Sequence, residues 1–376
     1  TPAPRPPASA PAPSRARTRG HSPAGEPAVV AIGSPMLDTI ARVPDDFLLA
    51  HALPKGDATP LSDAAAFARL KAAASAASSS GTACACGGCA TNTGKVLAAL
   101  GCRAALCGAV GCDGAAALIR EGLRARGLAD LCVEADSGSG PPSATGEVLC
   151  LVTSDSERTF AYISGASAAL TGGELVAALR RSAAASGRPG LVYFDVYTLL
   201  CAGELAEEGM REAQALGACA GLNLGSAGIV AAQRGRLWEL LRAGLCGVLT
   251  MNAAEAQALC GEGEGIAARD ACAMAARHCD LVLLTLGVEG LWVADGRGAP
   301  PEWHGVAPVG GVVDSTGAGD YFAGGFLAAW LHRLPPARCV GWGAAAAAEV
   351  LGVVGADLGE EGWRRLRDRC RVPDGP

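Results

Sequence analysis

The chain has 376 residues, of which 50% are hydrophobic, enough apolar material to bury the core of a large domain. Its formal net charge is -6, which argues against nucleic acid as a partner and favours a small polar substrate. Glycine, arginine or aspartate interrupts every apolar run before it reaches the ~20 residues that a membrane helix requires, so the sequence predicts no membrane span.

Residues 1–26 are rich in proline, alanine, serine and arginine and contain a single acid, Glu26. Because this segment has no apolar periodicity, we expect a disordered tail followed by one folded domain over 27–372. The composition is equally typical of a transit peptide remnant and of a plain tail. We therefore expect a cytoplasmic protein, or a plastid or mitochondrial one if the tail is a transit peptide.

The first buried strand is predicted over 27–34, where an apolar run ends in a turn at Gly33 and Ser34. In an α/β sheet, ligands collect at the carboxyl ends of strands, so Asp38 is a candidate for holding a pair of sugar hydroxyls. A turn-capping aspartate is the structural alternative. Residues 39–63 and 145–164 alternate apolar and polar residues between turn signals, as short strands with one exposed face do.

Sixteen cysteines are scattered mostly where alanine or valine would serve, and only Cys84, Cys86 and Cys89 cluster. No second CxxC and no pair of histidines stands at the spacing of a zinc site. We interpret the cysteines as small core residues of a protein in a reducing compartment, with a metal or redox role for the cluster as the alternative.

The turn at Gly87 and Gly88 leads into a helical segment that superficially resembles a P-loop. The next glycine of that motif comes one residue too late, and Val96 stands where serine or threonine must hold magnesium, so we reject this interpretation. We expect Thr91 or Asn92 to cap the helix. The Asn92 amide can both donate to and accept from sugar hydroxyls.

Farther along, strand-like runs alternate with helical ones, which predicts a parallel sheet with helices on both faces. The predicted strands cover 104–110, 191–194, 218–224, 247–251 and 281–286. No strand is followed by G-x-G-x-x-G, so a Rossmann dehydrogenase is excluded. After the fourth of these strands, Asn252 and Glu255 are spaced so that a helix puts both on one face, and an ordinary capping pair is the alternative.

A small-residue turn over 316–319 separates an apolar run that stops at Asp314 from an apolar helix that begins beside Asp320. Glycines let the backbone N–H groups point to one place, where the helix dipole also attracts phosphate. A carboxylate beside such an anion site is favourable if it accepts the proton of a neutral hydroxyl, so Asp320 is our candidate general base. The alternative is a glycine-rich turn with an ordinary first-turn acid.

The heptapeptide at 314–320, Asp-Ser-Thr-Gly-Ala-Gly-Asp, resembles the C-terminal signature of the PfkB (ribokinase-like) family of sugar and nucleoside kinases, with Ser315 in place of the usual threonine. Residues 87–101 are similar to the N-terminal signature, a Gly-Gly pair followed by asparagine and a helix that ends at Leu-Gly. The resemblance covers roughly everything after residue 27. It implies an α/β fold, a three-layer α/β/α doubly wound and mostly parallel sheet, with a small β lid from about 39–63 and 145–164.

This resemblance also implies transfer of the γ-phosphoryl group of ATP to a hydroxymethyl oxygen. The implied catalytic residues are the base Asp320 and the amides of Gly317, Ala318 and Gly319. The implied substrate-binding residues are Asp38, Gly87, Gly88, Asn92, the lid arginine Arg158 and, as an aromatic platform, Phe194. The implied ATP-binding residues are Asn223, Asn252, Thr285, Gly287, Gly290 and Gly317. Mg²⁺ would be held through waters by Glu255 and Asn252, with a monovalent cation such as K⁺ as a further candidate.

Residues 33–38, 46–48 and 53–57 resemble adenosine kinases and their bacterial relatives more than ribokinases, so we expect a nucleoside substrate. A ribokinase-type or fructokinase-type sugar kinase and a catalytically silent scaffold protein of the same fold are the alternatives. Apart from ATP and the small-molecule substrate we expect no partner, and either a monomer or a homodimer.

Overall fold

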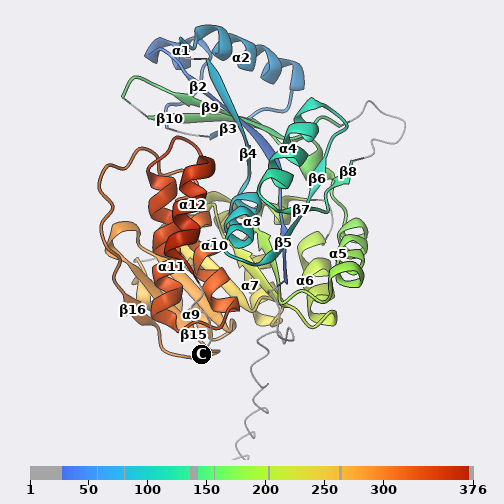
Figure 1. Cartoon of the computed structure of the whole chain (residues 1–376), viewed down its shortest axis with the longest axis vertical. Helices are drawn as coiled ribbons and strands as arrows, with labels where there is room; N and C mark the ends of the chain where they lie inside the picture. The colour runs from blue at the N-terminus through green and yellow to red at the C-terminus, as the bar shows by residue number, and fades with distance from the viewer. Residues whose placement is uncertain are drawn as a thin grey trace, which may run out of the picture.

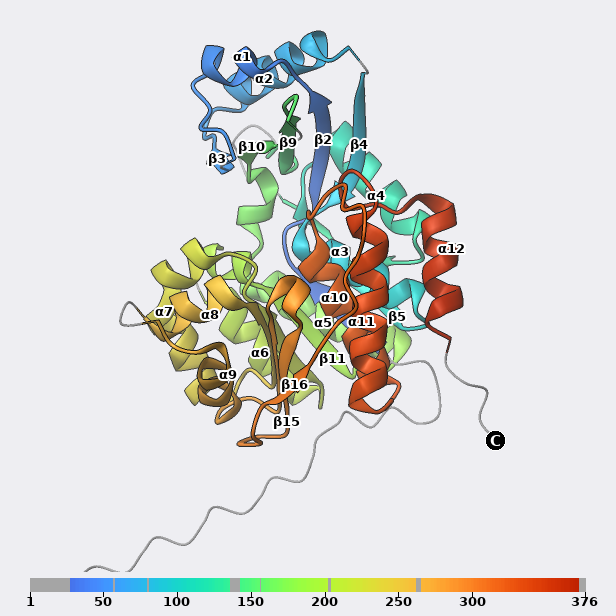
Figure 2. The same ribbon diagram turned by 90° about the vertical axis from the view of Figure 1, so that its left-hand side faces the viewer.

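The computed structural model describes residues 28–56, 58–79, 81–135, 143–155, 157–201, 204–261 and 265–371. The expected tail over 1–26 lies outside the described residues. Within them the chain folds into a large body and a smaller layered unit above it, which Figures 1 and 2 show from two directions.

The large body is built on one sheet with the strand order β16-β15-β14-β13-β12-β11-β1-β5-β7. Neighbouring strands are parallel from β7 to β14, and only β15 and β16 at one edge run antiparallel. The strands are β1 (Ala28–Ile32), β5 (Arg103–Cys107), β7 (Ala129–Asp130), β11 (Leu191–Asp195), β12 (Cys219–Asn223), β13 (Val248–Asn252), β14 (Leu281–Thr285), β15 (Leu291–Asp295) and β16 (Glu302–His304).

Both faces of this sheet are buried because successive strand side chains alternate between two hydrophobic clusters. In β1, Val29 and Ala31 belong to one cluster, whereas Val30 and Ile32 belong to the other. The first cluster is covered by α3 (Cys89–Ala99), α4 (Gly114–Ala125), α10 (Ala318–Leu331), α11 (Pro336–Leu351) and α12 (Gly359–Arg369). The second is covered by α5 (Gly172–Ser186), α6 (Leu205–Ala215), α7 (Ala227–Arg242), α8 (Ala253–Cys260) and α9 (Ala268–Ala276). The predicted three-layer α/β/α fold is therefore confirmed.

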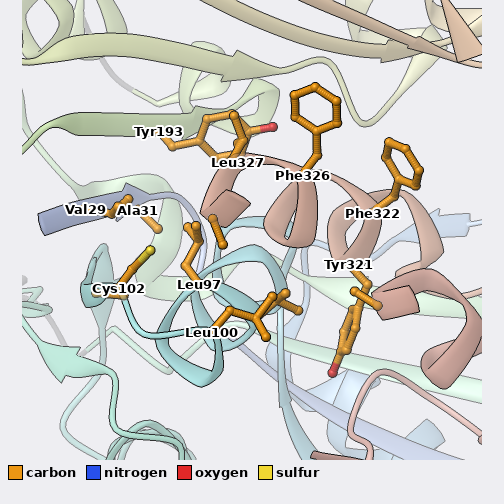
Figure 3. Close-up of a cluster of buried hydrophobic side chains, with 14 of the residues drawn as sticks. Val29, Ala31, Leu97, Leu100, Cys102, Tyr193, Tyr321, Phe322, Phe326 and Leu327 are labelled. Carbon is orange, nitrogen blue, oxygen red and sulfur yellow. The ribbon is translucent and has the colours of Figure 1, made fainter. Parts of the chain in front are cut away.

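Helix α10 contributes Phe326 and Leu327 to the first cluster, which also contains Leu97 of α3 and Val29 and Tyr193 of the sheet (Figure 3). These five side chains are at most 1% exposed. Burying a leucine or phenylalanine side chain stabilises a fold by roughly 1.5–3 kcal/mol. The core therefore fixes α10 firmly, and with it the functional turn at the N-terminus of this helix.

The smaller unit is a sheet with the strand order β3-β10-β9-β2-β4, which we call the lid. Its strands are β2 (Met36–Arg42), β3 (Ala58–Pro60), β4 (Thr82–Gly87), β9 (Glu147–Val152) and β10 (Arg158–Ile163). Helices α1 (Asp45–Ala50) and α2 (Ala64–Ala77) cover its outer face, where Phe47 and Phe67 pack on Leu149 and Ala161. Of these strands, β4 lies outside the segments for which the sequence predicts a strand.

Short elements complete the described part of the chain. They are the strand pair β6 (Ala109–Val110) and β8 (Val133–Glu134) and the 3₁₀ helices η1 (Gly165–Ala169), η2 (Val196–Leu200) and η3 (Gly287–Glu289). None of the described helices combines the length and the apolar character needed to cross a membrane.

Candidate active site

Helix α10 begins at the small-residue turn. Its N-terminal cap, Gly317, has a φ of 75°, a left-handed backbone conformation that favours glycine. Because the helix starts at Ala318, its first backbone N–H groups have no partner inside the helix and the positive end of its dipole lies at the turn. The turn therefore offers N–H groups suited to a phosphate, with Asp320 in the first helical turn.

The Asp320 carboxylate is held between two asparagine amides. Asn92 Nδ2 donates to Oδ2 and Asn223 Nδ2 donates to Oδ1, each over 3.1 Å. Burial raises the pKa of Asp320 to about 6, while the hydrogen bonds from Asn92, Asn223 and the Cys89 thiol act in the opposite direction. The carboxyl group is thus mostly ionised at neutral pH, with a pKa high enough to accept a proton usefully.

Asp314 organises the loop in front of α10. Its buried carboxylate accepts the backbone N–H of Thr316 on Oδ1 over 2.7 Å and that of Gly355 on Oδ2 over 2.6 Å. The Arg158 guanidinium of β10 pairs with the same Oδ1. The family resemblance implies that Arg158 reaches the substrate or the γ-phosphate. In this structure the buried carboxylate takes up the guanidinium and links the lid to the loop instead.

A cavity of about 300 Å³ opens between this loop and the carboxyl ends of β12, β13 and β14. Its lining includes Cys89, Asn223, Thr250, Asn252, Glu255, Thr285, Gly317, Ala318, Gly319 and Asp320. Parallel strands of an α/β sheet place ligand sites at this edge. Most of the residues expected around ATP are thereby brought together. Gly287 and Gly290 are not among the lining residues. Gly290 instead packs closely against β16, where a Cβ atom on it would lie 2.3 Å from the His304 carbonyl oxygen.

Asn252 and Glu255 form a reciprocal cap at the start of α8. The Asn252 side-chain oxygen accepts the Glu255 N–H over 3.0 Å, and the Glu255 carboxylate accepts from the Asn252 backbone N–H and side-chain amide over 2.9 and 2.8 Å. Burial raises the pKa of Glu255 to about 7, the Asn252 backbone N–H lowers it, and the charge of Asp320 raises it further. Asn252 and Glu255 therefore do form the capping pair given above as the alternative, and Glu255 also lines the cavity.

The cavity suits Mg²⁺ bound mainly through water and phosphate. Two buried carboxylates, Glu255 and Asp320, face it and repel each other, and its lining residues include no lysine or arginine. Of the two, Glu255 is the candidate to hold Mg²⁺, since carboxylate oxygens are ligands that Mg²⁺ prefers. Across the described ranges, no three His, Cys, Asp or Glu residues are grouped closely enough to ligate an ion by themselves. The same finding removes the metal interpretation of Cys84, Cys86 and Cys89.

The substrate-side residues meet where the lid joins α3. A Cβ atom at Gly87 would lie 2.1 Å from Asp38 Oδ2, so the missing side chain makes room for the carboxylate. Burial raises the pKa of Asp38 to about 7, and the charge of Lys95 acts in the opposite direction. Gly88 has a φ of 99° and caps α3 with its backbone. A carboxylate and a helix N-terminus thus lie at one junction.

The expectation that Thr91 or Asn92 caps this helix is wrong. Helix α3 already starts at Cys89, since Gly88 adopts the positive φ that the tight entry needs. Both predicted caps lie inside the first turns and are buried. The displacement frees the Asn92 side chain, whose Nδ2 donates to Asp320 and whose Oδ1 accepts no hydrogen bond from the described residues.

Phe194 does not form the expected aromatic platform. It is 0% exposed and faces the α5–α6 side of the sheet, where a Cβ atom at Gly209 would lie 2.8 Å from its ring. Among the described aromatic residues, Phe322 lines the cavity, and the half-buried Tyr197 of η2 lies near Asp320. Burial raises the pKa of Tyr197, and so do the nearby charges of Cys89, Asp195 and Asp320. Phe194 and Tyr197 are only three residues apart at the end of the same predicted strand, so the sequence alone does not show which ring lies near the site.

Comparison with known proteins agrees with this geometry. The family model described as pfkB family carbohydrate kinase matches residues 57–361. The solved structure of adenosine kinase from Sinorhizobium meliloti is similar with a TM-score of 0.75 and 27% identity, covering 92% of this chain and 99% of that one. A probable sugar kinase from Rhizobium etli CFN 42 has a TM-score of 0.75, 24% identity and coverages of 92% and 98%.

Adenosine kinase from Anopheles gambiae, solved with P1,P4-di(adenosine-5) tetraphosphate, has a TM-score of 0.71, 22% identity and coverages of 87% and 96%. No curated protein sequence matches. The fold and the site define a kinase, a phosphotransferase that acts on a hydroxyl group of a sugar or nucleoside and uses ATP. The chain belongs to the pfkB family of carbohydrate kinases.

Proposed function

We propose that this kinase phosphorylates the hydroxymethyl group of a nucleoside, with adenosine as the favoured substrate. The observation that carries the proposed chemistry is the Asp320 carboxylate, held between the amides of Asn92 and Asn223 in the first turn of α10. It lies in the first turn of the helix, at the positive end of the helix dipole, so a proton acceptor and an anion site share one wall of the cavity.

In this mechanism the substrate hydroxymethyl oxygen attacks the γ-phosphorus of ATP while its proton passes to Asp320. The bond from the γ-phosphorus to the bridging oxygen breaks, and ADP leaves. The amides of Gly317, Ala318 and Gly319 stabilise the charge on the transferred phosphoryl group, a contribution of roughly 3–4 kcal/mol per donor in other enzymes. Asp314 keeps these amides in place through its bonds to the loop.

Mg²⁺, when bound, would neutralise charge on the β- and γ-phosphates, with Glu255 and Asn252 holding its waters. Glu255 is suited to this because its carboxylate is already fixed by two hydrogen bonds from Asn252. The fixed orientation points the remaining lone pairs at the cavity without any rearrangement of α8.

The substrate is proposed to bind where the lid faces the large body. Asp38 would accept hydrogen bonds from two sugar hydroxyls, and the unpartnered Asn92 Oδ1 would accept another. On β10, Phe160 and Tyr162 alternate with Ala161, which packs on the outer face, so both rings turn toward the large body. Together with Tyr197 they offer flat apolar surface suited to a purine.

A sugar kinase is the second candidate, and the similarity to the Rhizobium etli probable sugar kinase favours it. A coupled assay of ADP release with adenosine, inosine, ribose and fructose separates the two. We expect the highest kcat/KM for adenosine and a rise in its KM of at least about tenfold in Tyr197→Ala, without a matching rise for ribose. Phe194→Leu is the matched control, because this core ring should affect stability and not KM. A higher kcat/KM for a free sugar would reverse the assignment, and no turnover of any substrate would favour the scaffold alternative.

A further inference from the structure

Behind the Asp320 carboxylate, a chain of hydrogen bonds extends through three neighbouring strands. Asn223 Nδ2 donates to Asp320 Oδ1 over 3.1 Å, and Thr250 Oγ1 donates to Asn223 Oδ1 over 3.2 Å. The phenol of Tyr193 contacts Thr250 Oγ1 in turn. All four residues are buried, with Tyr193 only 1% exposed and Thr250 5%. None of the steps in the proposed mechanism uses Thr250 or Tyr193.

The donor and acceptor of each hydrogen bond in this series follow from the number of protons that each side chain carries. The amide nitrogen of Asn223 faces the carboxylate, so its oxygen is the acceptor for Thr250. Thr250 has a single hydroxyl proton and uses it on Asn223, which leaves its lone pairs for the Tyr193 O–H. Burial raises the pKa of Tyr193, so the phenol keeps that proton. Each residue therefore donates toward Asp320.

The pairing register of the strands brings the hydrogen-bonded side chains together. Asn223 of β12 and Thr250 of β13 are directly paired, so their side chains lie together on one face. Tyr193 of β11 pairs with Gly221 of β12, and a Cβ atom at Gly221 would lie 2.7 Å from the tyrosine ring. The ring crosses the strand at this glycine to reach Thr250.

Without this chain, the Asn223 amide would have two possible orientations. Turned around, it would place Oδ1 against the Asp320 carboxylate, where two acceptors repel, and leave the carboxylate with Asn92 as its only amide donor. In the observed orientation the hydroxyl of Thr250 supplies the buried donor that the Asn223 oxygen needs, whereas the turned amide would give up that hydrogen bond as well as the one to Asp320.

We propose that Thr250 is a positioning residue for phosphoryl transfer: its hydroxyl, fixed by Tyr193, orients the Asn223 amide so that it donates to Asp320 and holds the carboxylate for proton abstraction. This inference rests on the proposed function, in which Asp320 is the base. Thr250 acts through Asn223 and takes no proton from the substrate.

The test compares Thr250→Val, which removes the hydroxyl at nearly constant volume, with Thr250→Ser, which keeps it. Losing a donor destabilises the charged carboxylate, so the acid limb of the kcat/KM profile should move to higher pH by about one unit in Thr250→Val. At pH 6 this variant should lose about fivefold in kcat/KM, and at pH 9 less than about threefold. Thr250→Ser should restore the wild-type profile, and Tyr193→Phe should shift it in the same direction as Thr250→Val but less.

Thr145→Val is the matched control, because Thr145 is 1% exposed and its hydroxyl donates to Asp113 and accepts from Gly111, in a network separate from Asp320. It should lower Tm without moving the acid limb. A second readout needs no substrate: titration of ¹³C-labelled aspartate carboxyls by NMR, with the Asp320 signal identified by its absence in Asp320→Asn. That signal should titrate at higher pH in Thr250→Val.

An unmoved acid limb and an unmoved Asp320 titration in Thr250→Val would overturn the inference, whatever happens to Tm. A changed KM for ATP with a fixed acid limb would also overturn it, because Thr250 would then contact ATP directly. Failure of Thr250→Ser to restore the profile would overturn it as well. Full activity of Asp320→Asn would instead refute the proposed function itself, so the two failures are distinguishable.

Discussion

Replacing Asp320 with asparagine should abolish most activity without unfolding the protein. The change keeps the size of the side chain and removes the proton acceptor. General-base help is typically worth ~10²- to 10⁴-fold, so we expect kcat to fall by at least about a hundredfold at pH 8, equivalent to about 2.7 kcal/mol of activation free energy.

Whereas activity should fall, the stability of Asp320→Asn should equal or exceed that of the wild type. The rise of the Asp320 pKa from the ordinary 3.8 to about 6 corresponds to about 3 kcal/mol by which the fold disfavours the charged carboxylate above pH 6. Asparagine carries no charge, although its amide meets two amide donors, Asn92 and Asn223, and satisfies only one of them. These effects oppose each other, so at pH 8 the Tm of the variant should equal or exceed that of the wild type.

The assay measures kcat by coupled ADP release with saturating ATP and adenosine, and it measures binding of both ligands by calorimetry. We expect binding within about threefold of the wild type, because Asp38 and the N–H groups at the turn are untouched. In the wild type, activity should fall as the pH drops through about 6, where Asp320 takes up a proton. Wild-type kcat in Asp320→Asn at pH 8 would refute the assignment of the base.

Three further predictions concern the surroundings of the base. Gly87→Ala places a Cβ atom 2.1 Å from Asp38 Oδ2 and should raise KM for the nucleoside at least about tenfold while leaving KM for ATP unchanged; equal effects on both would contradict a substrate role for Asp38. Glu255→Gln should raise the Mg²⁺ concentration needed for half activity, and excess Mg²⁺ should partly restore the rate; an unchanged Mg²⁺ titration would exclude Glu255 from the metal site. Asp195, 2% exposed, has a pKa raised to about 7 chiefly by burial, so wild-type stability should fall as the pH rises from about 4 to 7. Asp195→Asn escapes that loss, so its Tm relative to wild type should increase by at least about 4 °C between pH 4 and pH 8, and a constant difference would contradict the argument.

Much of the fold could be predicted because local patterns determine it. The apolar runs that became β11 to β14 differ from the predicted strands by at most one residue at either end. Asp113 caps α4, with its side chain accepting the Ala116 N–H over 2.9 Å. Such features depend on neighbours a few residues away, which the sequence displays directly.

The site was harder to predict because it depends on contacts between distant segments. Asn92 and Asn223 were assigned to the substrate and to ATP, yet both donate to Asp320, from 228 and 97 residues away. Neighbouring Tyr193 and Phe194 are both apolar enough for a core strand, and the sequence does not reveal which face of the sheet carries the site. Only the strand register shows that Tyr193 turns toward Thr250 and that Phe194 turns away.

The lid is formed by two separate segments of the chain and is not a single insertion. It begins just after β1, returns to the large body where β4 ends at Gly87, and is entered again at β9 before β10 leads into η1. Two of these crossings lie beside residues proposed for the substrate site, Asp38 on β2 and Gly87 at the end of β4. A chimera that borrows the lid of a relative must therefore exchange two separate stretches together. Under the proposed function this exchange would transfer part of the substrate selectivity, so selectivity and lid architecture would be inherited as one unit.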